Sequence, residues 1–394
     1  MTDIEIFRNI RYAHSLRFEQ PELIPWDGVR LTERGPVCPQ LPSRLELVQG
    51  PMPEMEMSEH CQVLSVFSPA LSGKRPVMVF FHGGGFVTGG GELPWHDGDK
   101  LAYEQGVVVV TVTYRLGVFG YFQQPGGSDP SPAMADQVAA LRWVKTNIGA
   151  FGGDPENVTV FGQSAGGCSI ATMLAWGHGG GLFKRAILQS GAYGLAHTRA
   201  EADTTSDMFL DELGGDPRGA TIDELIVAQG RLAAKLKRLA LWSAVLPPAD
   251  RGPGVDVIAG WCRDDALPFV LLQKQIQPSP GTETHFLDET REMNELFEGG
   301  SRSLVRDMAE KGHRALLYRF DWESPGTGLG ACHCIELPFL LGSEQAWRSA
   351  PAVAGSDWSK IEPIGRRMRK LWADFARGDY ADPDWSPGTV RILP

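Results

Sequence analysis

The sequence lacks the features that carry a protein into a membrane or onto a nucleic acid. None of its hydrophobic runs approaches the roughly 20 residues that a membrane-spanning helix needs. No block of lysines and arginines reaches about five residues, and the formal net charge is −11, so the basic surface of a nucleic-acid-binding protein is missing. With 42% hydrophobic and 22% charged residues in 394, we expect a soluble globular protein with neither a membrane nor a nucleic acid as partner.

Cysteine is also scarce. Six cysteines in a chain of this length do not form a disulfide scaffold, and no C-x-x-C pair of the kind that binds zinc occurs. The first residues, MTDIEIFRNIRYAH, carry acidic side chains and no apolar core, so they do not read as a secretory signal. We therefore expect a cytoplasmic location, free thiols by default, and no metal or cofactor.

Apolar segments instead alternate between strand-like and helix-like patterns. We expect strands at 76–81, 107–114, 157–161, 184–189, 256–259 and 315–320, and helices at 97–105, 132–150, 166–176, 265–277, 288–297, 301–312 and 361–377, with 198–242 wholly helical. This order predicts an α/β fold in which helices cover both faces of a mostly parallel sheet. No repeat or linker divides the chain, so we expect a single domain, 1–394, in which helical insertions at 195–255 and 266–312 form a small lid.

One serine lies where such a fold places a nucleophile. The stretch FGQSAGG puts Ser164 in a G-x-S-x-G pattern, which is weak by itself in a chain with 47 glycines. Its position between a strand and a helix predicts a nucleophile elbow, the sharp turn that exposes a serine hydroxyl. The alternative is a small residue in a glycine-rich turn.

A serine nucleophile needs a histidine base and a carboxylate that orients it. His333 lies in the glycine-rich stretch GTGLGACHCIELPF after the last strand, whereas His313 directly precedes a strand and is better explained as a surface or capping residue. Asp264 and Asp265 follow the strand at 256–259, so one of them is expected to be the acid. Both could instead cap the following helix, an interpretation that we keep for Asp264.

The stretch FFHGGGFVTGGG predicts the oxyanion hole. Glycines after the strand at 76–81 leave backbone N–H groups free to bind a developing oxyanion, together with the N–H of Ala165. The run lacks the G-K-[ST] ending of a phosphate-binding loop.

These segments resemble the type-B carboxylesterase family, which includes the cholinesterases. The resemblance rests on GPVCPQ, FFHGGGF, TYRLGVFGYF, DQVAALRWVKTNIGAFGGDPENVTVFGQSAGG, FKRAILQSG and LWADFARGDYADPDW, and it runs nearly end to end. It implies an α/β-hydrolase fold and a serine esterase that cleaves a small-molecule ester through an acyl-enzyme. Carried over residue by residue, it makes Ser164 the nucleophile, Asp265 the acid, His333 the base, and Gly84, Gly85 and Ala165 the oxyanion donors.

The same resemblance assigns two further pairs. It implies a structural salt bridge between Arg17 and Glu59 and a disulfide between Cys38 and Cys61, although a reducing compartment would oppose the disulfide. Cys262, Cys332 and Cys334 flank the proposed acid and base, which leaves open a disulfide between the two loops or a Cys/His metal site.

The sequence departs from the family in several places. Gln163 stands where the family usually has Glu, which removes a negative charge close to His333. Only 101 residues separate Ser164 from Asp265 and 68 separate Asp265 from His333, so we expect a reduced lid and a more open site. Residues 45–57 contain no tryptophan of the kind that holds choline, so a quaternary ammonium substrate is not expected.

The substrate pocket is harder to predict. Candidate lining residues are Phe86, Gln163, Trp95 and Phe119, with Trp242 and Phe339 as further aromatics, but core packing explains an aromatic equally well. A same-fold acyltransferase, an amide or carbamate hydrolase, a natural-product cyclase and a non-catalytic interaction protein are the alternatives to an esterase. The sequence names neither the substrate nor the oligomeric state.

Overall fold

A single nine-stranded sheet organises the protein, which we analysed as a computed structural model. The structure describes residues 4–124, 130–191, 193–250, 252–379 and 390–393. The strand order across the sheet is β1-β4-β6-β5-β7-β8-β9-β10-β11. The strands are β1 (Glu5–Arg11), β4 (Val63–Ser68), β5 (Arg75–Phe81), β6 (Val108–Val112), β7 (Gly153–Gln163), β8 (Arg185–Gln189), β9 (Asp256–Cys262), β10 (Ala315–Phe320) and β11 (Val390–Leu393), and β2 (Ala13–His14) pairs with β3 (Glu22–Leu23) in a separate ribbon.

The middle of the sheet is parallel, as the sequence predicts. The strands from β6 to β10 in this order run parallel to one another, whereas β4 joins β6, β1 joins β4 and β11 joins β10 in antiparallel fashion. The carboxyl ends of the parallel strands therefore meet at one edge of the sheet, where loops that carry chemistry collect.

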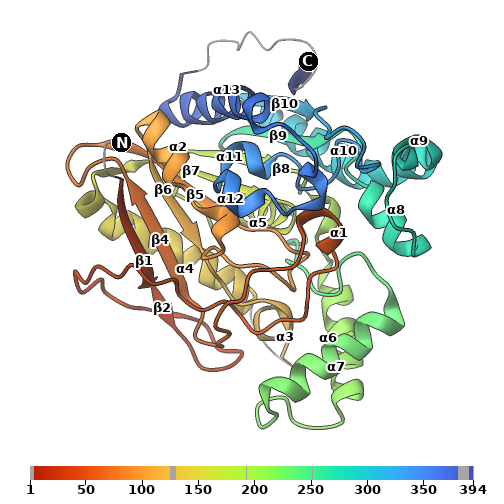
Figure 1. Ribbon diagram of the computed structural model, residues 1–394. Helices are drawn as coiled ribbons and strands as arrows, with labels where there is room; N and C mark the ends of the chain where they lie inside the picture. Colours follow the sequence, from red (N-terminus) through yellow and green to blue (C-terminus); the bar gives the residue numbers. More distant parts are fainter. Residues whose placement is uncertain (1–3, 125–129, 192, 251, 380–389, 394) are drawn as a thin grey trace.

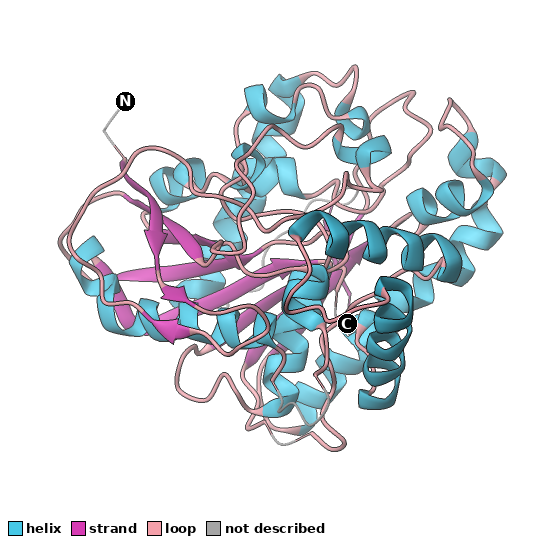
Figure 2. Ribbon diagram, turned by 90° about the horizontal axis from the view of Figure 1, so that it is seen from below, coloured by secondary structure: helices cyan, strands magenta, loops and turns pink. Residues whose placement is uncertain are grey.

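Alternation along the strands explains the two helical layers. Val77, Val79 and Phe81 of β5 point to one hydrophobic core, and Met78 and Phe80 point to the other. The first core is closed by α4 (Pro132–Asn147), α5 (Ala165–Trp176) and α10 (Leu287–Glu310), and the second by α2 (Asp99–Gln105), α11 (Leu337–Leu340) and α13 (Trp358–Arg377). Figure 2 shows the strands crossing the middle of the molecule between these helices.

The remaining helices lie around this three-layer core. They are α1 (Glu46–Gln49), α3 (Gly117–Tyr121), α6 (Arg199–Leu213), α7 (Ile222–Leu236), α8 (Leu267–Lys274), α9 (Thr282–His285) and α12 (Glu344–Trp347). Figure 1 shows α6 and α7 together at the bottom of the view and α8 and α9 at its right edge. The predicted insertions thus contain α6 and α7 in the first case and α8 to α10 in the second, and α10 packs against β9 and β10.

Two helix predictions are wrong. The segment 198–242 is not one helix, because Gly214 ends α6 in a left-handed conformation and Thr221 with Glu224 forms a capping box that starts α7. The separate helices expected at 288–297 and 301–312 are a single helix, α10, which runs through Gly299 and Gly300. Each glycine costs a helix only about 1 kcal/mol, so packing against the sheet outweighs the local preference.

The predicted salt bridge between Arg17 and Glu59 is present. Arg17 Nε donates to Glu59 at 2.8 Å, and its Nη2 also contacts this carboxylate. Arg17 Nη1 further donates to the carbonyl of Ala220 at 2.5 Å, so the pair fastens the N-terminal segment to the loop between α6 and α7. Across the described part of the chain, none of the helices has both the length and the apolar character required to cross a membrane.

Candidate active site

Ser164 lies in a strained turn between β7 and α5. Its φ of 55° and ψ of −122° are unfavourable for a residue with a side chain, and such strain is typical of a nucleophile elbow. Two glycines permit the turn: a Cβ on Gly166 would lie 2.0 Å from the Phe81 carbonyl oxygen, and a Cβ on Gly191 would lie 1.9 Å from the Ser164 carbonyl oxygen. The glycines around Ser164 are therefore required by close backbone packing.

Asp265 and His333 meet at the carboxyl ends of β9 and β10. His333 Nδ1 and Asp265 Oδ1 are 2.5 Å apart, and both side chains are fully buried. The backbone N–H of Cys262 donates to the other oxygen of Asp265 at 2.9 Å, which fixes the carboxylate. Because an ionised Asp265 can only accept, we assign the proton to Nδ1, and Nε2 of a neutral His333 is left with its lone pair.

Gln163 connects this pair to the nucleophile elbow. Its amide nitrogen lies 3.2 Å from His333 Nε2, so Gln163, the residue before Ser164, donates to the lone pair of the base. The Ser164 hydroxyl has no hydrogen-bond partner in the part of the chain that the structure describes. The rings of Phe269 and Phe297 lie 5.1 and 5.0 Å from the imidazole and close its other side.

The glycine-rich loop after β5 lies against Ser164 and Gln163. A Cβ on Gly83 would lie 3.1 Å from the Ser164 Cβ, and a Cβ on Gly84, whose φ is +118°, would lie 1.9 Å from the Thr88 carbonyl oxygen. Among the described residues, no acceptor pairs with the backbone N–H groups of Gly84 and Gly85. The N–H of Ala165 begins α5 and so has no partner within the helix.

Buried rings hold this loop in place. His82 Nδ1 bonds the carbonyl of Gly83 at 2.8 Å, and the Tyr114 hydroxyl donates to the His82 carbonyl at 2.7 Å. Burial lowers the pKa of His82 to about 3, so its ring is neutral and donates from Nδ1. The loop is thus fixed by neutral hydrogen bonds before any substrate binds.

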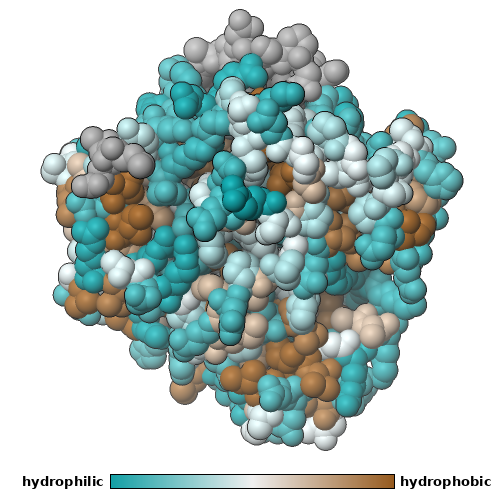
Figure 3. All heavy atoms as spheres, viewed as in Figure 1, coloured by the Kyte–Doolittle hydropathy of each residue, from teal (hydrophilic) through white to brown (hydrophobic). Residues whose placement is uncertain are grey.

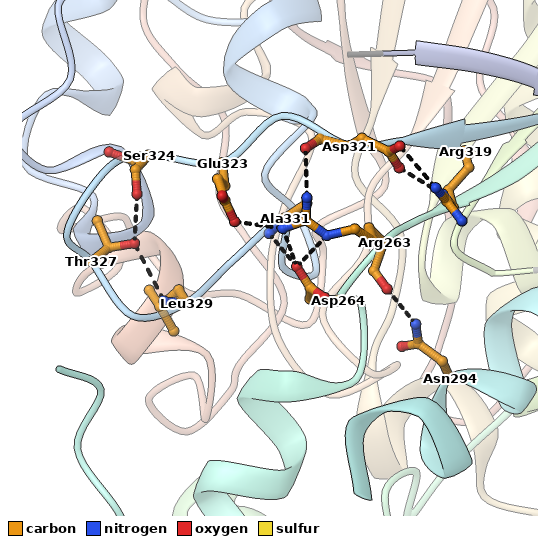
Figure 4. A network of polar contacts seen from close by, with 10 residues as sticks. All are labelled: Arg263, Asp264, Asn294, Arg319, Asp321, Glu323, Ser324, Thr327, Leu329 and Ala331. Carbon is orange, nitrogen blue, oxygen red and sulfur yellow. Dashed lines mark hydrogen bonds and ion pairs between the residues drawn. The ribbon is translucent and has the colours of Figure 1, made fainter. Parts of the chain in front are cut away.

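Asp264 does not cap α8 as expected. That helix begins after Ala266 without a side-chain cap, and Asp264 instead accepts from the backbone N–H of Ala331 at 2.9 Å and from Arg263 at 2.7 Å. The Asp264 N–H donates in turn to the Ala331 carbonyl at 2.9 Å. Figure 4 shows Asp264 between Arg263 and Ala331. Asp264 therefore ties the loop that carries Asp265 to the loop that carries His333.

A cavity of about 160 Å³ opens at Ser164. Its walls are Leu41, Pro42, Ser43, Arg44, Leu45, Gly84, Gly85, Val87, Thr88, Ser164, Leu195, Gln229, Gly230, Ala233, Arg238, Leu239, Ala240, Leu241, Phe269 and Phe297. Figure 3 shows hydrophobic residues gathered in the lower part of the face that it draws, where Figure 1 places α3, α6 and α7. The cavity is mainly apolar, as pockets for small organic molecules are.

Most of the predicted pocket aromatics lie elsewhere. Phe86 is buried against Tyr121, and Phe119 borders a separate hollow with Arg17. Trp95 and Gln163 line a second, smaller cavity of about 30 Å³ next to the first. Trp242 packs against Phe209, and Phe339 against Phe320 and Trp322, so these two serve the core.

Two aromatic residues that line the cavity, Phe269 and Phe297, were not predicted from the sequence. They lie on α8 and α10, inside ordinary amphipathic patterns, and no local motif distinguishes them. Their ring contacts with His333 depend on tertiary packing, in which α10 lies against β9 and β10 and α8 lies against α10.

All six cysteines are buried free thiols. The suggested disulfide between Cys38 and Cys61 is therefore absent, and so is the one suggested between Cys262 and Cys332 or Cys334. Burial raises the pKa of Cys262, Cys332 and Cys334, which keeps them as neutral thiols. In the described ranges, no three His, Cys, Asp or Glu side chains are grouped closely enough to hold a metal ion.

Comparison with known proteins agrees with this geometry. The sequence model of the carboxylesterase family matches residues 1–223. Similar proteins include a probable N-octanoylanthranilate hydrolase, AqdA2, of Rhodococcus erythropolis (35% identity, covering 97% of this chain and 91% of that protein) and the para-nitrobenzyl esterase of Bacillus subtilis (32%, covering 91% and 82%).

Solved structures agree as well. A para-nitrobenzyl esterase superposes with a TM-score of 0.82 at 28% identity and covers 98% of this chain and 90% of its own. The Geobacillus stearothermophilus carboxylesterase EST55 superposes with a TM-score of 0.79 at 30% identity and covers 99% and 90%. The protein has the α/β-hydrolase fold, belongs to the carboxylesterase family and is a carboxylic ester hydrolase.

Proposed function

We propose that the protein hydrolyses a small-molecule carboxylic ester through an acyl-enzyme on Ser164. His333 takes the hydroxyl proton at Nε2 while Ser164 attacks the ester carbonyl, and Asp265 holds the imidazole in the tautomer that makes this possible. The N–H groups of Gly84, Gly85 and Ala165 bind the oxyanion. His333 then returns the proton to the leaving alcohol, and water, activated by the same histidine, releases the acid.

The observation that carries the proposal is the strained backbone of Ser164. A non-glycine residue with a φ of 55° persists only where its surroundings enforce it, and here the turn directs the serine into the cavity. The buried Asp265–His333 pair contacts the residue next to Ser164, and the glycine loop lies against Ser164 itself.

Gln163 adds a condition to this mechanism. The Ser164 hydroxyl must reach the same Nε2 lone pair that the Gln163 amide contacts, so Gln163 competes with Ser164 for the base. A neutral amide makes a weaker hydrogen bond than a charged group, which keeps this competition mild.

The hydrolysis of an amide or a carbamate is the second candidate. One relative is named a probable N-octanoylanthranilate hydrolase, and another, 30% identical over 94% of this chain, is named a phenmedipham hydrolase. The mainly apolar cavity next to Ser164 suits an acyl chain in either kind of substrate. Acyl transfer and cyclisation use the same acyl-enzyme and differ only in which nucleophile accepts the acyl group.

Burst kinetics test the proposal. The protein is mixed with excess p-nitrophenyl butyrate, and nitrophenol release is followed on the millisecond scale beside Ser164→Ala and Asp265→Asn variants. We expect about one equivalent of rapid release that Ser164→Ala abolishes, with the butyryl group found on the Ser164 peptide by mass spectrometry. Slow release at equal rates in the protein and in Ser164→Ala would refute the acyl-enzyme.

Product analysis with added alcohol separates hydrolysis from acyl transfer. Free butyrate as the main product supports hydrolysis, whereas a new butyrate ester at low alcohol concentration identifies a transferase. N-Octanoylanthranilate in the same assay tests the second candidate.

A further inference from the structure

The cavity at Ser164 carries positive charge in an acidic protein. Of the described residues that line it, only Arg44 and Arg238 are charged at neutral pH, and both are arginines. The chain as a whole has a formal net charge of −11. The cavity lining therefore carries two cations and no carboxylate, although the chain as a whole is acidic.

Arg44 lies at the oxyanion side of the cavity. It precedes α1, and its Nη2 would lie 3.6 Å from a Cβ placed on Gly85. Its two terminal nitrogens donate to backbone carbonyls, Nη1 to Arg238 at 3.1 Å and Nη2 to Leu239 at 2.5 Å. These carbonyls hold the guanidinium in place, and they are neutral.

No described carboxylate pairs with Arg44, whereas the buried arginines Arg115 and Arg369 are paired. Arg115 binds Asp136 and Arg369 binds Glu104, each through two hydrogen bonds. Arg44 is partly exposed to solvent. Protein atoms nevertheless surround its guanidinium, and this burial lowers the pKa of the group. A partly desolvated cation without a counter-charge is unfavourable, and an anion delivered by a ligand would offset that cost.

Arg238 is the second cation of the cavity lining. Its carbonyl accepts from Arg44, and its own guanidinium donates to the Thr205 hydroxyl at 3.4 Å. The cavity also has apolar walls, which include Val87, Leu241 and the ring of Phe297. A molecule with a hydrocarbon part and an anionic group would satisfy both.

We propose that Arg44, supported by Arg238, binds an anionic group of the substrate, so that the enzyme prefers acyl compounds that bear a carboxylate near the scissile bond. The proposal rests on ester hydrolysis at Ser164 and names its substrate class. Arginine suits this role because its planar guanidinium binds a carboxylate through two parallel hydrogen bonds.

Matched esters test the proposal. On the leaving-group side, 4-nitro-3-(octanoyloxy)benzoate is compared with 2-nitrophenyl octanoate, which has the same acyl group and lacks only the carboxylate. On the acyl side, 2-nitrophenyl hydrogen adipate is compared with 2-nitrophenyl hexanoate. Each ester is assayed with the full chain and with Arg44→Gln, Arg44→Lys and Arg238→Gln. Arg142→Gln, an exposed arginine of α4 outside the cavity, is the control.

We expect Arg44→Gln to lower kcat/KM for the anionic ester of at least one pair by about tenfold or more, mainly through KM, as loss of a charged hydrogen bond predicts. The neutral ester of that pair should change by less than about twofold, Arg44→Lys should lose less, and Arg142→Gln should change neither. Raising the salt concentration from about 0.01 M to about 1 M should reduce the preference of the native protein, because the Debye length falls from about 30 Å to about 3 Å.

Equal losses on the neutral and anionic esters of both pairs would overturn the proposal, because Arg44 would then be only structural. Unchanged rates for the anionic esters in Arg44→Gln and Arg238→Gln would overturn it as well. If Arg44→Gln fails to fold, the comparison of Arg44→Lys and Arg238→Gln between neutral and anionic esters decides in the same way. Failure of the native protein to cleave any of the four esters would count against the proposed function, whereas cleavage without discrimination would reject this inference alone.

Discussion

Replacement of Glu336 by Gln should make the protein more stable above neutral pH. Glu336 lies three residues after His333, is fully buried, and accepts a hydrogen bond from the Tyr318 hydroxyl at 2.9 Å. Burial, and then the nearby charge of Asp265, raise the pKa of Glu336 to about 8 from its ordinary value of 4.5. The folded protein therefore holds this proton at pH values at which the unfolded chain has lost it.

The sign and size of the effect follow from this difference in proton binding. Between pH 4.5 and pH 8 the folded state binds more protons than the unfolded state, so the contribution of Glu336 to stability is full below pH 4.5 and is lost as the pH rises through 8. At about 1.36 kcal/mol for each factor of ten in proton affinity, the whole loss amounts to about 5 kcal/mol. Gln carries no titrating proton and keeps an acceptor for Tyr318, so Glu336→Gln removes the loss.

Urea denaturation at about pH 5, 7 and 9 measures the effect. We expect the free energy of unfolding of Glu336→Gln to exceed that of the native protein by an amount that grows with pH, up to about 5 kcal/mol. Glu310→Gln, at an exposed position of α10, is the control and should leave the pH dependence unchanged. A difference between Glu336→Gln and the native protein that stays constant with pH would refute the reasoning.

Three further outcomes can be checked. Asp264→Ala should lower the free energy of unfolding by about 2–4 kcal/mol and kcat/KM for p-nitrophenyl butyrate by about tenfold or more, because it removes the hydrogen bond that holds the Ala331 loop. Glu323→Ala removes only an exposed partner of Arg263 and should lower the free energy of unfolding by under about 1 kcal/mol. Similar results for the two variants would contradict the role of Asp264. Gly84→Ala should reduce kcat about a hundredfold or more, because a Cβ there would lie 1.9 Å from the Thr88 carbonyl oxygen and would displace the loop. Gly149→Ala, where a Cβ meets nothing within 4 Å, is the control and should be active. Full activity of Gly84→Ala would contradict the role of this loop in binding the oxyanion. Unfolded without reductant, the protein should release six titratable thiols in an assay with a thiol reagent, and a count of four or fewer would show a disulfide.

Local sequence predicted much of the candidate site. The glycines around Ser164 and those after β5 form short motifs that the sequence shows directly, although Gly166 is required by Phe81 of a neighbouring strand and Gly84 by its own loop. The apolar β-branched run at 107–114 likewise predicts a buried central strand, because a strand covered on both faces has no polar side. His333 and Asp265 could be placed at strand ends from the chain order alone.

The role of Asp264 could not be predicted in this way. A carboxylate at the start of a helix usually caps it, and only the pairing of the loop after β9 with the loop after β10 brings Asp264 to Ala331, 67 positions along the chain. The same holds for Gln163, whose contact with His333 joins the ends of β7 and the loop after β10.

The cavity is decided entirely by tertiary structure. Arg44, Phe269 and Phe297 come from segments with no shared motif. They line one cavity because α10 packs against β9 and β10, α8 packs against α10, and Arg44 lies next to Gly85.

The sequence by itself thus determined most of the strand and helix order, the elbow at Ser164 and the glycine loop, because each leaves a pattern of residue types within a short stretch of chain. Tertiary structure alone decided which aromatics face the cavity, what Asp264 binds and where an unpaired Arg44 lies, because those contacts join residues that only the folded sheet brings together.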